Sequence, residues 1–225
     1  MVTRELKKIF LSASIPTKER DPKYFETMDI IAIRDAILAI TTTVIPEHRL
    51  IWGGHPSITP LIYNTMEALA INKLCEQKDW SILSKKKRSD LLTDELKKEI
   101  QNHVHLYQSE YFRDVFPSDN EKFENITFTK NMGDIHSSIQ EMRIKMISEN
   151  DFSAAIFVGG MDGIEVEYKM FREKHPEALI LPIASTGAAT KIVYDTLVSE
   201  EIKDPRFEID YGYMSLFQNL LMDKI

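Results

Sequence analysis

The chain has 225 residues, 43% of them hydrophobic and 28% charged, with a formal net charge of −7. A chain of this length can bury roughly 70% of its unfolded surface, so it needs no disulfide or metal to complete a core. The negative charge disfavours nucleic acid as a partner, because phosphate backbones attract basic surfaces. The single cysteine, Cys75, excludes an internal disulfide, and we expect it to be a small residue of the core.

The sequence also argues against a membrane partner. It has no run of eighteen apolar residues, and its first ten residues lack the apolar stretch of a signal peptide. Together with the single cysteine, this composition predicts a cytoplasmic protein.

The first half of the chain alternates strand and helix patterns. The apolar run at 7–15 predicts a buried strand, and a second strand starts at Arg49 and breaks at Gly53-Gly54. Two helices follow these strands, the first of them ended by the β-branched residues of 41–46. Their expected apolar faces consist of Ile30, Ile31, Ile33, Ile37, Leu38 and Ile40 in the first helix and Leu61, Thr65, Leu69 and Leu74 in the second.

The pattern changes at 76–101, a charged stretch with a thin apolar stripe that we expect to be a peripheral helical excursion. Strands are then predicted at 103–108, 125–129, 154–158 and 178–184, with a helix between the second and third of these. That helix has Ile135, Ile139, Met142 and Met146 on one face. About six mainly parallel strands alternating with helices predict one α/β domain over 1–225, a doubly wound Rossmann-like sheet with helices on both faces.

The chain ends with a predicted helix at about 211–223. Its apolar face is formed by Tyr213, Leu216, Phe217, Leu220 and Leu221. This spacing is typical of a helix that packs either on its own sheet or on another subunit. We expect a homo-oligomer, because two-fold dimers are the commonest assemblies.

Three loops at the predicted carboxyl ends of strands contain glycine: 53–60, 159–167 and 185–190. Such loops converge on one crevice of a parallel sheet, and each following helix directs its N-terminal amides there. They predict a site for a phosphate-bearing ligand, although the spacing matches neither GxGxxG nor a P-loop. A side chain at Gly54 or Gly159 would then strain the backbone or occupy the place of the anion.

Polar residues near these loops are further candidates. Ser12 and Ser14 end the first strand and could donate to phosphate, and His55 follows the second-strand glycines. Arg143 offers a planar fork for phosphate, and Glu167 could accept from ribose hydroxyls or assist loss of a base, a role that Glu165 could also take. His103 and His105 are expected to alternate on a strand as packing residues, so no metal site is predicted.

The order of these motifs along the chain resembles that of the SLOG superfamily. This superfamily groups SMF/DprA domains, LOG phosphoribohydrolases and the ligand-sensing domains of Thoeris-type effectors and TRPM channels. Gly159, Gly160 and Gly163 match the glycines of the LOG motif PGGxGTxxE, and Glu167 matches its glutamate. Arg143 stands where LOG enzymes have the arginine that acts with this glutamate at an N-glycosidic bond.

The sequence departs from LOG within the motif. Val158 replaces the proline, Ile164 replaces the threonine, and Met161-Asp162 lengthens the loop by one residue. The variant is more similar to the sensor branch, whose members bind nucleotide-derived signals. The resemblance therefore implies a ligand sensor in prokaryotic antiviral defence, with an ADP-ribose-like or cyclic nucleotide ligand, no further cofactor, and a TIR-type or other effector as partner.

Two alternatives remain open: a nucleotide N-glycosidase in which Glu167 and Arg143 are catalytic, and a scaffold whose outer helices mediate assembly. The expected ligand-binding residues are Ser12, Ser14, Gly53, Gly54, His55, Arg143, Gly159, Gly160, Met161, Asp162, Gly163, Glu167, Ser185, Thr186 and Gly187.

Overall fold

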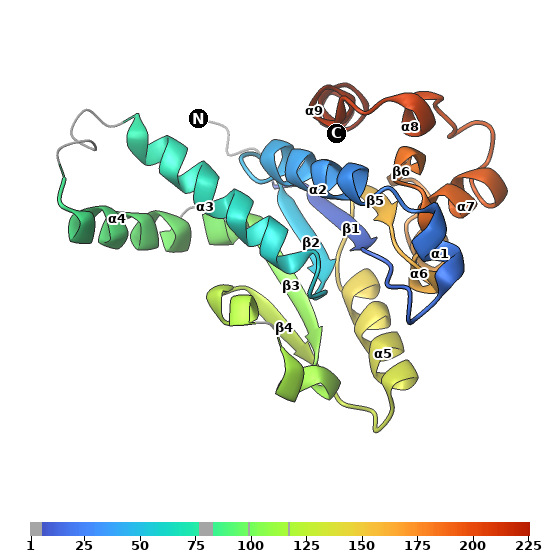
Figure 1. Cartoon of the computed structure of the whole chain (residues 1–225), viewed down its shortest axis with the longest axis horizontal. Coiled ribbons are helices and arrows are strands. Elements are labelled where there is room, and N and C mark those ends of the chain that lie inside the picture. Colours follow the sequence, from blue (N-terminus) through green and yellow to red (C-terminus); the bar gives the residue numbers. More distant parts are fainter. Residues whose placement is uncertain (1–5, 77–82, 99, 117) are drawn as a thin grey trace.

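The computed structural model of the chain describes residues 6–76, 83–98, 100–116 and 118–225. Its centre is a six-stranded parallel sheet in the order β4-β3-β2-β1-β5-β6 (Figure 1). The strands are β1 (Lys8–Ser14), β2 (Arg49–Gly53), β3 (Val104–Ser109), β4 (Ile126–Thr129), β5 (Ala154–Gly159) and β6 (Leu179–Ile183). The expected doubly wound Rossmann-like fold is confirmed.

The order of the strands reverses beside β1. From β1 the chain builds outward to β2, β3 and β4, and it then returns to place β5 against the other edge of β1. The carboxyl ends of β1 and β5 therefore flank the switch point at which ligands of open α/β sheets bind.

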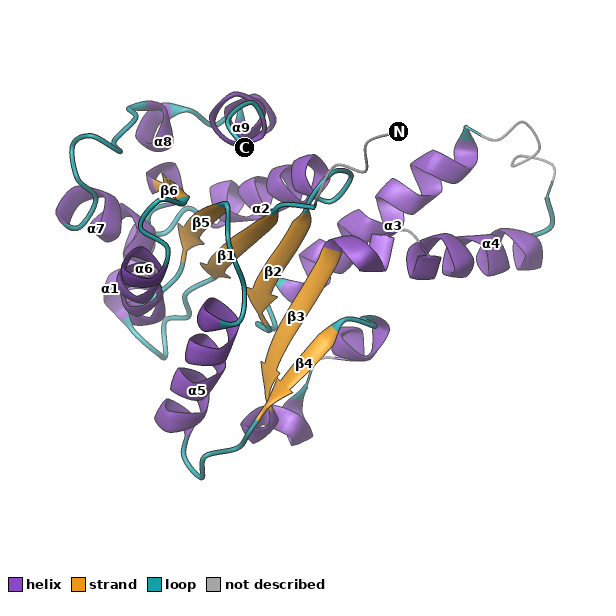
Figure 2. Ribbon diagram, turned by 180° about the vertical axis from the view of Figure 1, so that it is seen from behind, coloured by secondary structure: helices purple, strands orange, loops and turns teal. Residues whose placement is uncertain are grey.

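Helices cover both faces of the sheet (Figure 2). The longer ones are α2 (Ile30–Val44), α3 (Thr59–Cys75), α4 (Lys85–Lys98), α5 (Ile135–Ser148), α6 (Asp162–Lys174) and α7 (Ala188–Thr196). The short ones are α1 (Pro22–Thr27), α8 (Arg206–Ile209) and α9 (Tyr213–Phe217), which continues as a π-helical turn (Gln218–Met222). Helices α2, α3 and α9 share one hydrophobic cluster, and α5, α6 and α7 share the other.

The alternation of side chains along β1 separates these two clusters. Ile9 and Leu11 point toward the α2 side, whereas Phe10 points toward the α6 side. Ser12 and Ser14 continue the Phe10 series, because side chains two apart lie on the same face of a strand. Both hydroxyls therefore belong to the face that α5 and α6 cover.

Helix α2 ends at Val44, within the β-branched stretch 41–46 that was expected to end it, and the Thr41 hydroxyl donates to the carbonyl of Ile37 at 2.6 Å. Two other sequence-based expectations need correction. Ile30 and Ile31, expected on the apolar face of α2, are exposed because they lie at the end of α2 beyond the core. Cys75, expected in the core, is exposed at the last residue of α3, next to the buried Leu74.

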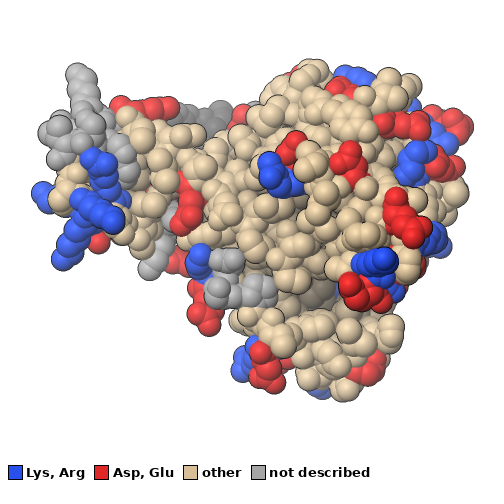
Figure 3. All heavy atoms as spheres, in the orientation of Figure 1, with Lys and Arg blue, Asp and Glu red and all other residues tan. Residues whose placement is uncertain are grey.

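The charged segment 76–101 contains a helix, α4, as its sequence predicted. Helix α4 packs beside α3, where Lys73 and Glu95 form an ion pair of 2.6 Å, while residues 77–82 and 99 of the predicted excursion lie outside the described residues. Lys85, Lys86 and Lys87 are exposed on α4, and on the face drawn in Figure 3 the other charges of both signs are interspersed. None of the described helices has the length and apolar content that a membrane span needs.

The C-terminal apolar face is buried within the chain. Tyr213, Leu216, Phe217, Leu220 and Leu221 are at most 4% exposed, in the cluster that also contains the buried residues of α2. Of the two alternatives for this face, the structure shows packing on its own chain. Self-association stays a prediction, but the apolar face of this helix is no longer an argument for it.

Candidate functional site

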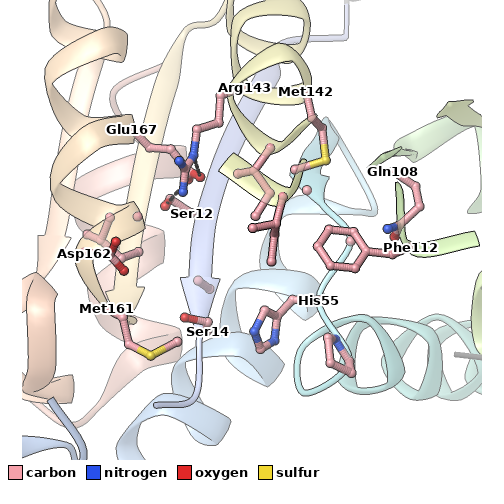
Figure 4. A pocket seen from close by; sticks show the side chains of 18 of the residues that line it. Ser12, Ser14, His55, Gln108, Phe112, Met142, Arg143, Met161, Asp162 and Glu167 are labelled. Atoms are coloured by element: carbon pink, nitrogen blue, oxygen red, sulfur yellow. Dashed lines mark hydrogen bonds and ion pairs between the residues drawn. The ribbon is translucent and has the colours of Figure 1, made fainter. Parts of the chain in front are cut away.

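A cavity of about 380 Å³ opens at the carboxyl ends of β1 and β2, between α5 and α6 (Figure 4). This volume falls in the range of small-molecule sites. Its wall combines the end of β1, the β2–α3 loop, the first turns of α6, one face of α5 and the segment after β3. The cavity therefore lies on the α6 side of the sheet, next to the switch point.

Arg143, Glu167 and Ser12 form one hydrogen-bonded group on this wall (Figure 4). Arg143 Nε donates to Glu167 Oε1 at 2.9 Å, and the Ser12 hydroxyl donates to Glu167 Oε2 at 2.5 Å. The side chains of Arg143 and Glu167 are only 17% and 15% exposed, so the ion pair is largely removed from water. The carboxylate binds both neighbours at once and fixes the plane of the guanidinium.

The pair comes together because of where α5 and α6 run. Arg143 lies in the middle of α5, on the side that faces α6, and Glu167 lies in the second turn of α6. Gly163, one turn earlier, leaves room for the guanidinium, because a Cβ at this position would collide with Nη2 of Arg143. This glycine has an ordinary helical φ, so its role here is space rather than backbone freedom.

His55 lies in the β2–α3 loop and lines the cavity opposite α6. Its Nδ1 lies 2.7 Å from the Ser57 hydroxyl and accepts from the Ser57 backbone N–H at 3.3 Å. Burial, reinforced by the positive charge of Arg20, lowers the pKa of His55 to about 4. The imidazole is therefore neutral at pH 7, and because Nδ1 accepts, its proton is on Nε2.

The end of the cavity near α5 and the post-β3 segment is apolar. The residues that share this character are Phe112, Val115, Phe116, Ile135, Ile139 and Met142. Ile135 and Ile139 lie on the face of α5 expected to pack on the core, but α5 begins beyond the end of the sheet, so its first turn faces the cavity instead. The site thus has a polar end and an apolar end.

The structure brings together most of the residues expected to bind ligand. Those that line the cavity are Ser12, Ser14, Gly53, Gly54, His55, Arg143, Met161, Asp162, Gly163 and Glu167. Glu165, considered as a substitute for Glu167, points away and accepts from the Tyr24 hydroxyl at 3.0 Å. Burial, and after it the hydrogen bond and negative charge of Glu165, raise the pKa of Tyr24 to about 12.

Five of the expected residues do not line the cavity: Gly159, Gly160, Ser185, Thr186 and Gly187. Gly159 and Gly160 have positive φ, as their turn requires, but they lie behind the wall, where a Cβ on Gly159 would collide with Ile33. Thr186 accepts from the Gly159 amide at 2.9 Å and so holds this turn. Likewise, a Cβ on Gly54 would collide with Gln108, so its small size serves packing inside the protein.

Sequence reasoning missed the end of β3 and the segment after it. Gln108 in β3 and Phe112 and Phe116 after it line the cavity, as do Arg20 and His136. The position of 108–116 at the carboxyl end of a predicted parallel strand indicates that this segment could border the site. It contains no glycine, however, and the site was predicted from loops that contain glycine. His103 precedes β3 and bonds the His48 carbonyl, and His105 bonds Thr127, so neither reaches the site.

Comparison with family models matches the chain to the SLOG cluster3 family over residues 23–77 and 89–221. The chain belongs to the SLOG cluster3 family. The match includes Arg143, the glycine turn and Glu167, but it begins after Ser12 and Ser14. No curated protein and no solved structure matches significantly.

Membership of SLOG cluster3 points to a nucleotide-related ligand-binding or LOG-like domain. The family match includes both helices that carry the Arg143–Glu167 pair. Among the described residues no group of three His, Cys, Asp or Glu side chains could hold a metal ion.

Proposed function

We propose that the cavity binds a nucleotide-derived small molecule and that the chain works as a ligand sensor. The observation that carries this proposal is the hydrogen-bonded group of Arg143, Glu167 and Ser12 beside the N-terminus of α6. These hydrogen bonds hold the Arg143 guanidinium in place before the ligand binds. Less side-chain conformational entropy is therefore lost on binding.

The polar end suits a phosphate. Arg143 uses Nε for Glu167, and within the described residues its two terminal nitrogens have no hydrogen-bond partner. The amides of Asp162 and Gly163 likewise lack acceptors in the part of the chain that the structure describes, because the N-cap Met161 offers no capping side chain. Guanidinium and helix N-terminal amides both bind oxyanions.

The middle of the cavity suits a sugar. Asp162 offers a carboxylate to hydroxyl groups, and the neutral His55 offers an N–H from Nε2. Ser14 adds a hydroxyl at the end of β1. These groups supply both acceptors and donors, which is the mixture that ribose hydroxyls need.

Binding is favoured over cleavage by what Glu167 does in the structure. Both carboxylate oxygens are engaged, one by Arg143 and one by Ser12. A general base or nucleophile needs an oxygen aimed at the reacting atom, whereas this carboxylate serves to orient the guanidinium. The N-glycosidase stays the second candidate, because the arginine and glutamate that LOG chemistry requires do lie together in the cavity.

The biological setting of the proposal rests on the resemblance. We infer that the ligand is an ADP-ribose-like or cyclic nucleotide signal in antiviral defence, and that a TIR-type or other effector reads the occupied state.

The test measures thermal stability and ligand integrity together. Purified chain is melted with ADP-ribose, NAD, AMP and cyclic ADP-ribose, and the solutions are analysed by chromatography after several hours. We expect a melting temperature that rises with ligand concentration, as mass action requires, and intact ligand. Arg143→Ala should lose the response, whereas Lys145→Ala, a charge removal on the same helix outside the cavity, should keep it.

Release of a free base that Glu167→Gln abolishes would establish the N-glycosidase. No response to any nucleotide would leave the scaffold alternative.

A further inference from the structure

The apolar end of the cavity is built differently from the polar end. It is formed by η3 (Glu110–Val115), by Phe116 after it and by the first turns of α5. Val115 is 73% exposed and Ile135 is 38% exposed, although both are apolar. Apolar side chains that line a cavity while remaining open to water mark a surface that a ligand or partner covers.

The aromatic rings of Phe112 and Phe116 form part of the wall at this end. Phe112 lines the cavity and packs edge-on against Tyr111, which does not line it, with 5.1 Å between ring centroids. Phe116 stacks on Phe128 with 5.8 Å between centroids. Rings supported by other rings are held in position, so they offer a planar ligand a preset face.

Gln108 supplies a polar contact at this end, where His136 in the first turn of α5 also lines the cavity. Gln108 is 4% exposed, and its Oε1 accepts from Asn120 Nδ2 at 3.0 Å and lies against the Cα of Gly54. Its Nε2, by contrast, has no hydrogen-bond partner among the described residues, and Figure 4 shows the carboxamide beside Phe112. An amide donor that faces a cavity and has no protein partner is placed to donate to an acceptor on a ligand.

We propose that this end binds the heterocyclic base of the ligand, with the ring packed on Phe112 and Met142 and a ring nitrogen or carbonyl oxygen accepting from Gln108 Nε2. Gln108 is then the residue that selects the base, because Asn120 fixes its oxygen and leaves the amide N–H₂ for the ligand. This inference rests on the proposed function, since it places the base opposite the phosphate end at Arg143.

The two ends make separable contributions, so the test uses a matched pair of ligands. AMP carries a base, and ribose 5-phosphate is the same sugar phosphate without it. In the wild-type protein we expect AMP to bind at least about tenfold more tightly than ribose 5-phosphate, because the base adds a stacking contact and a hydrogen bond. This comparison needs no variant.

Variants then assign the difference to residues. Gln108→Met, which keeps the length of the side chain, and Phe112→Leu should each weaken AMP roughly tenfold and change the Kd of ribose 5-phosphate less than about twofold. Phe25→Leu is the control, because Phe25 is an exposed aromatic residue of α1 that does not line the cavity. Calorimetric titration of protein that melts cooperatively measures each Kd.

Equal affinity of the wild type for AMP and ribose 5-phosphate would overturn the inference and leave the phosphate site intact. So would Gln108 and Phe112 variants that weaken both ligands by the same factor. Failure of AMP, ADP-ribose and ribose 5-phosphate to bind the wild type at all would overturn the proposed function and this inference with it.

Discussion

Arg143 on α5 and Glu167 on α6 are joined by a hydrogen bond of 2.9 Å between Nε and Oε1 in a wall of the cavity. The bond links the two helices that enclose the polar end of the site. The bond uses Nε and leaves the two terminal nitrogens of Arg143 for the phosphate in the proposed complex, so we expect Arg143 both to stabilise the ligand-free protein and to bind the ligand.

Arg143→Ala should therefore destabilise the protein as well as weaken binding. The substitution leaves the largely buried Glu167 carboxylate without its cation, which we expect to cost about 1–3 kcal/mol of unfolding free energy. Glu167→Gln should cost less, because an amide oxygen still accepts from Arg143. Urea denaturation of the two variants measures the difference, and equal loss in both would contradict this role of the pair.

Gly163→Ala should separate binding from folding. Its backbone is helical, so alanine is tolerated and improves helix propensity by up to about 1 kcal/mol, but the new Cβ displaces the Arg143 guanidinium. We expect stability within about 1 kcal/mol of wild type and nucleotide affinity at least about tenfold weaker. Titration calorimetry measures the nucleotide affinity, and urea denaturation of the same preparation measures the stability.

The comparison variant is Gly160→Ala. At φ +77° a non-glycine residue is strained, and its Cβ would collide with Ile164, so this variant should lose stability of about 1–3 kcal/mol. Wild-type affinity in Gly163→Ala would show that Arg143 does not need its observed position.

His55 should make stability depend on pH. Its pKa is about 4 in the folded protein and 6.5 in the unfolded chain, so between these values the unfolded state binds more protons. The stabilising contribution is complete above pH 6.5 and is lost as the pH falls toward 4, by at most about 3 kcal/mol. Denaturation of wild type and His55→Gln at pH 7 and pH 4.5 isolates this contribution from that of the carboxylates; parallel losses would refute it.

The C-terminal helix should be a structural element of the chain itself. Phe217 is fully buried against the α2 side, so Phe217→Ala should cost about 3–5 kcal/mol. Met214, on the same helix, is 51% exposed, and Met214→Ala should change stability by less than about 0.5 kcal/mol. Chemical denaturation compares the two, and a small effect of Phe217→Ala would mean that the helix does not pack as observed.

The alternation of strands and helices predicted the sheet because burial on both faces leaves a strong apolar signature. The glycine motif and the position of Arg143 likewise predicted the polar end of the cavity. What the sequence could not reveal is which side of the wall each glycine faces. Gly159 and Gly54 are small because Ile33 and Gln108 pack against them, a tertiary fact that a turn motif does not contain.

The apolar end was missed for a related reason. Ile135 fits the apolar face of a helix, and only the length of α5 beyond the sheet shows that this residue faces the cavity rather than the core. Gln108 sits within a strand pattern, and its role depends on Asn120, twelve residues away in sequence.

The most direct test of the central claim is a titration of ¹³C-methyl methionine-labelled protein with ADP-ribose, followed by NMR. Met142 and Met161 line the cavity on opposite walls, whereas Met214 is an exposed residue outside it. A ligand bound between α5 and α6 should shift the methyl resonances of Met142 and Met161 in a saturable manner and leave Met214 in place. Unchanged resonances of Met142 and Met161 at saturating ligand would contradict a nucleotide site in this cavity.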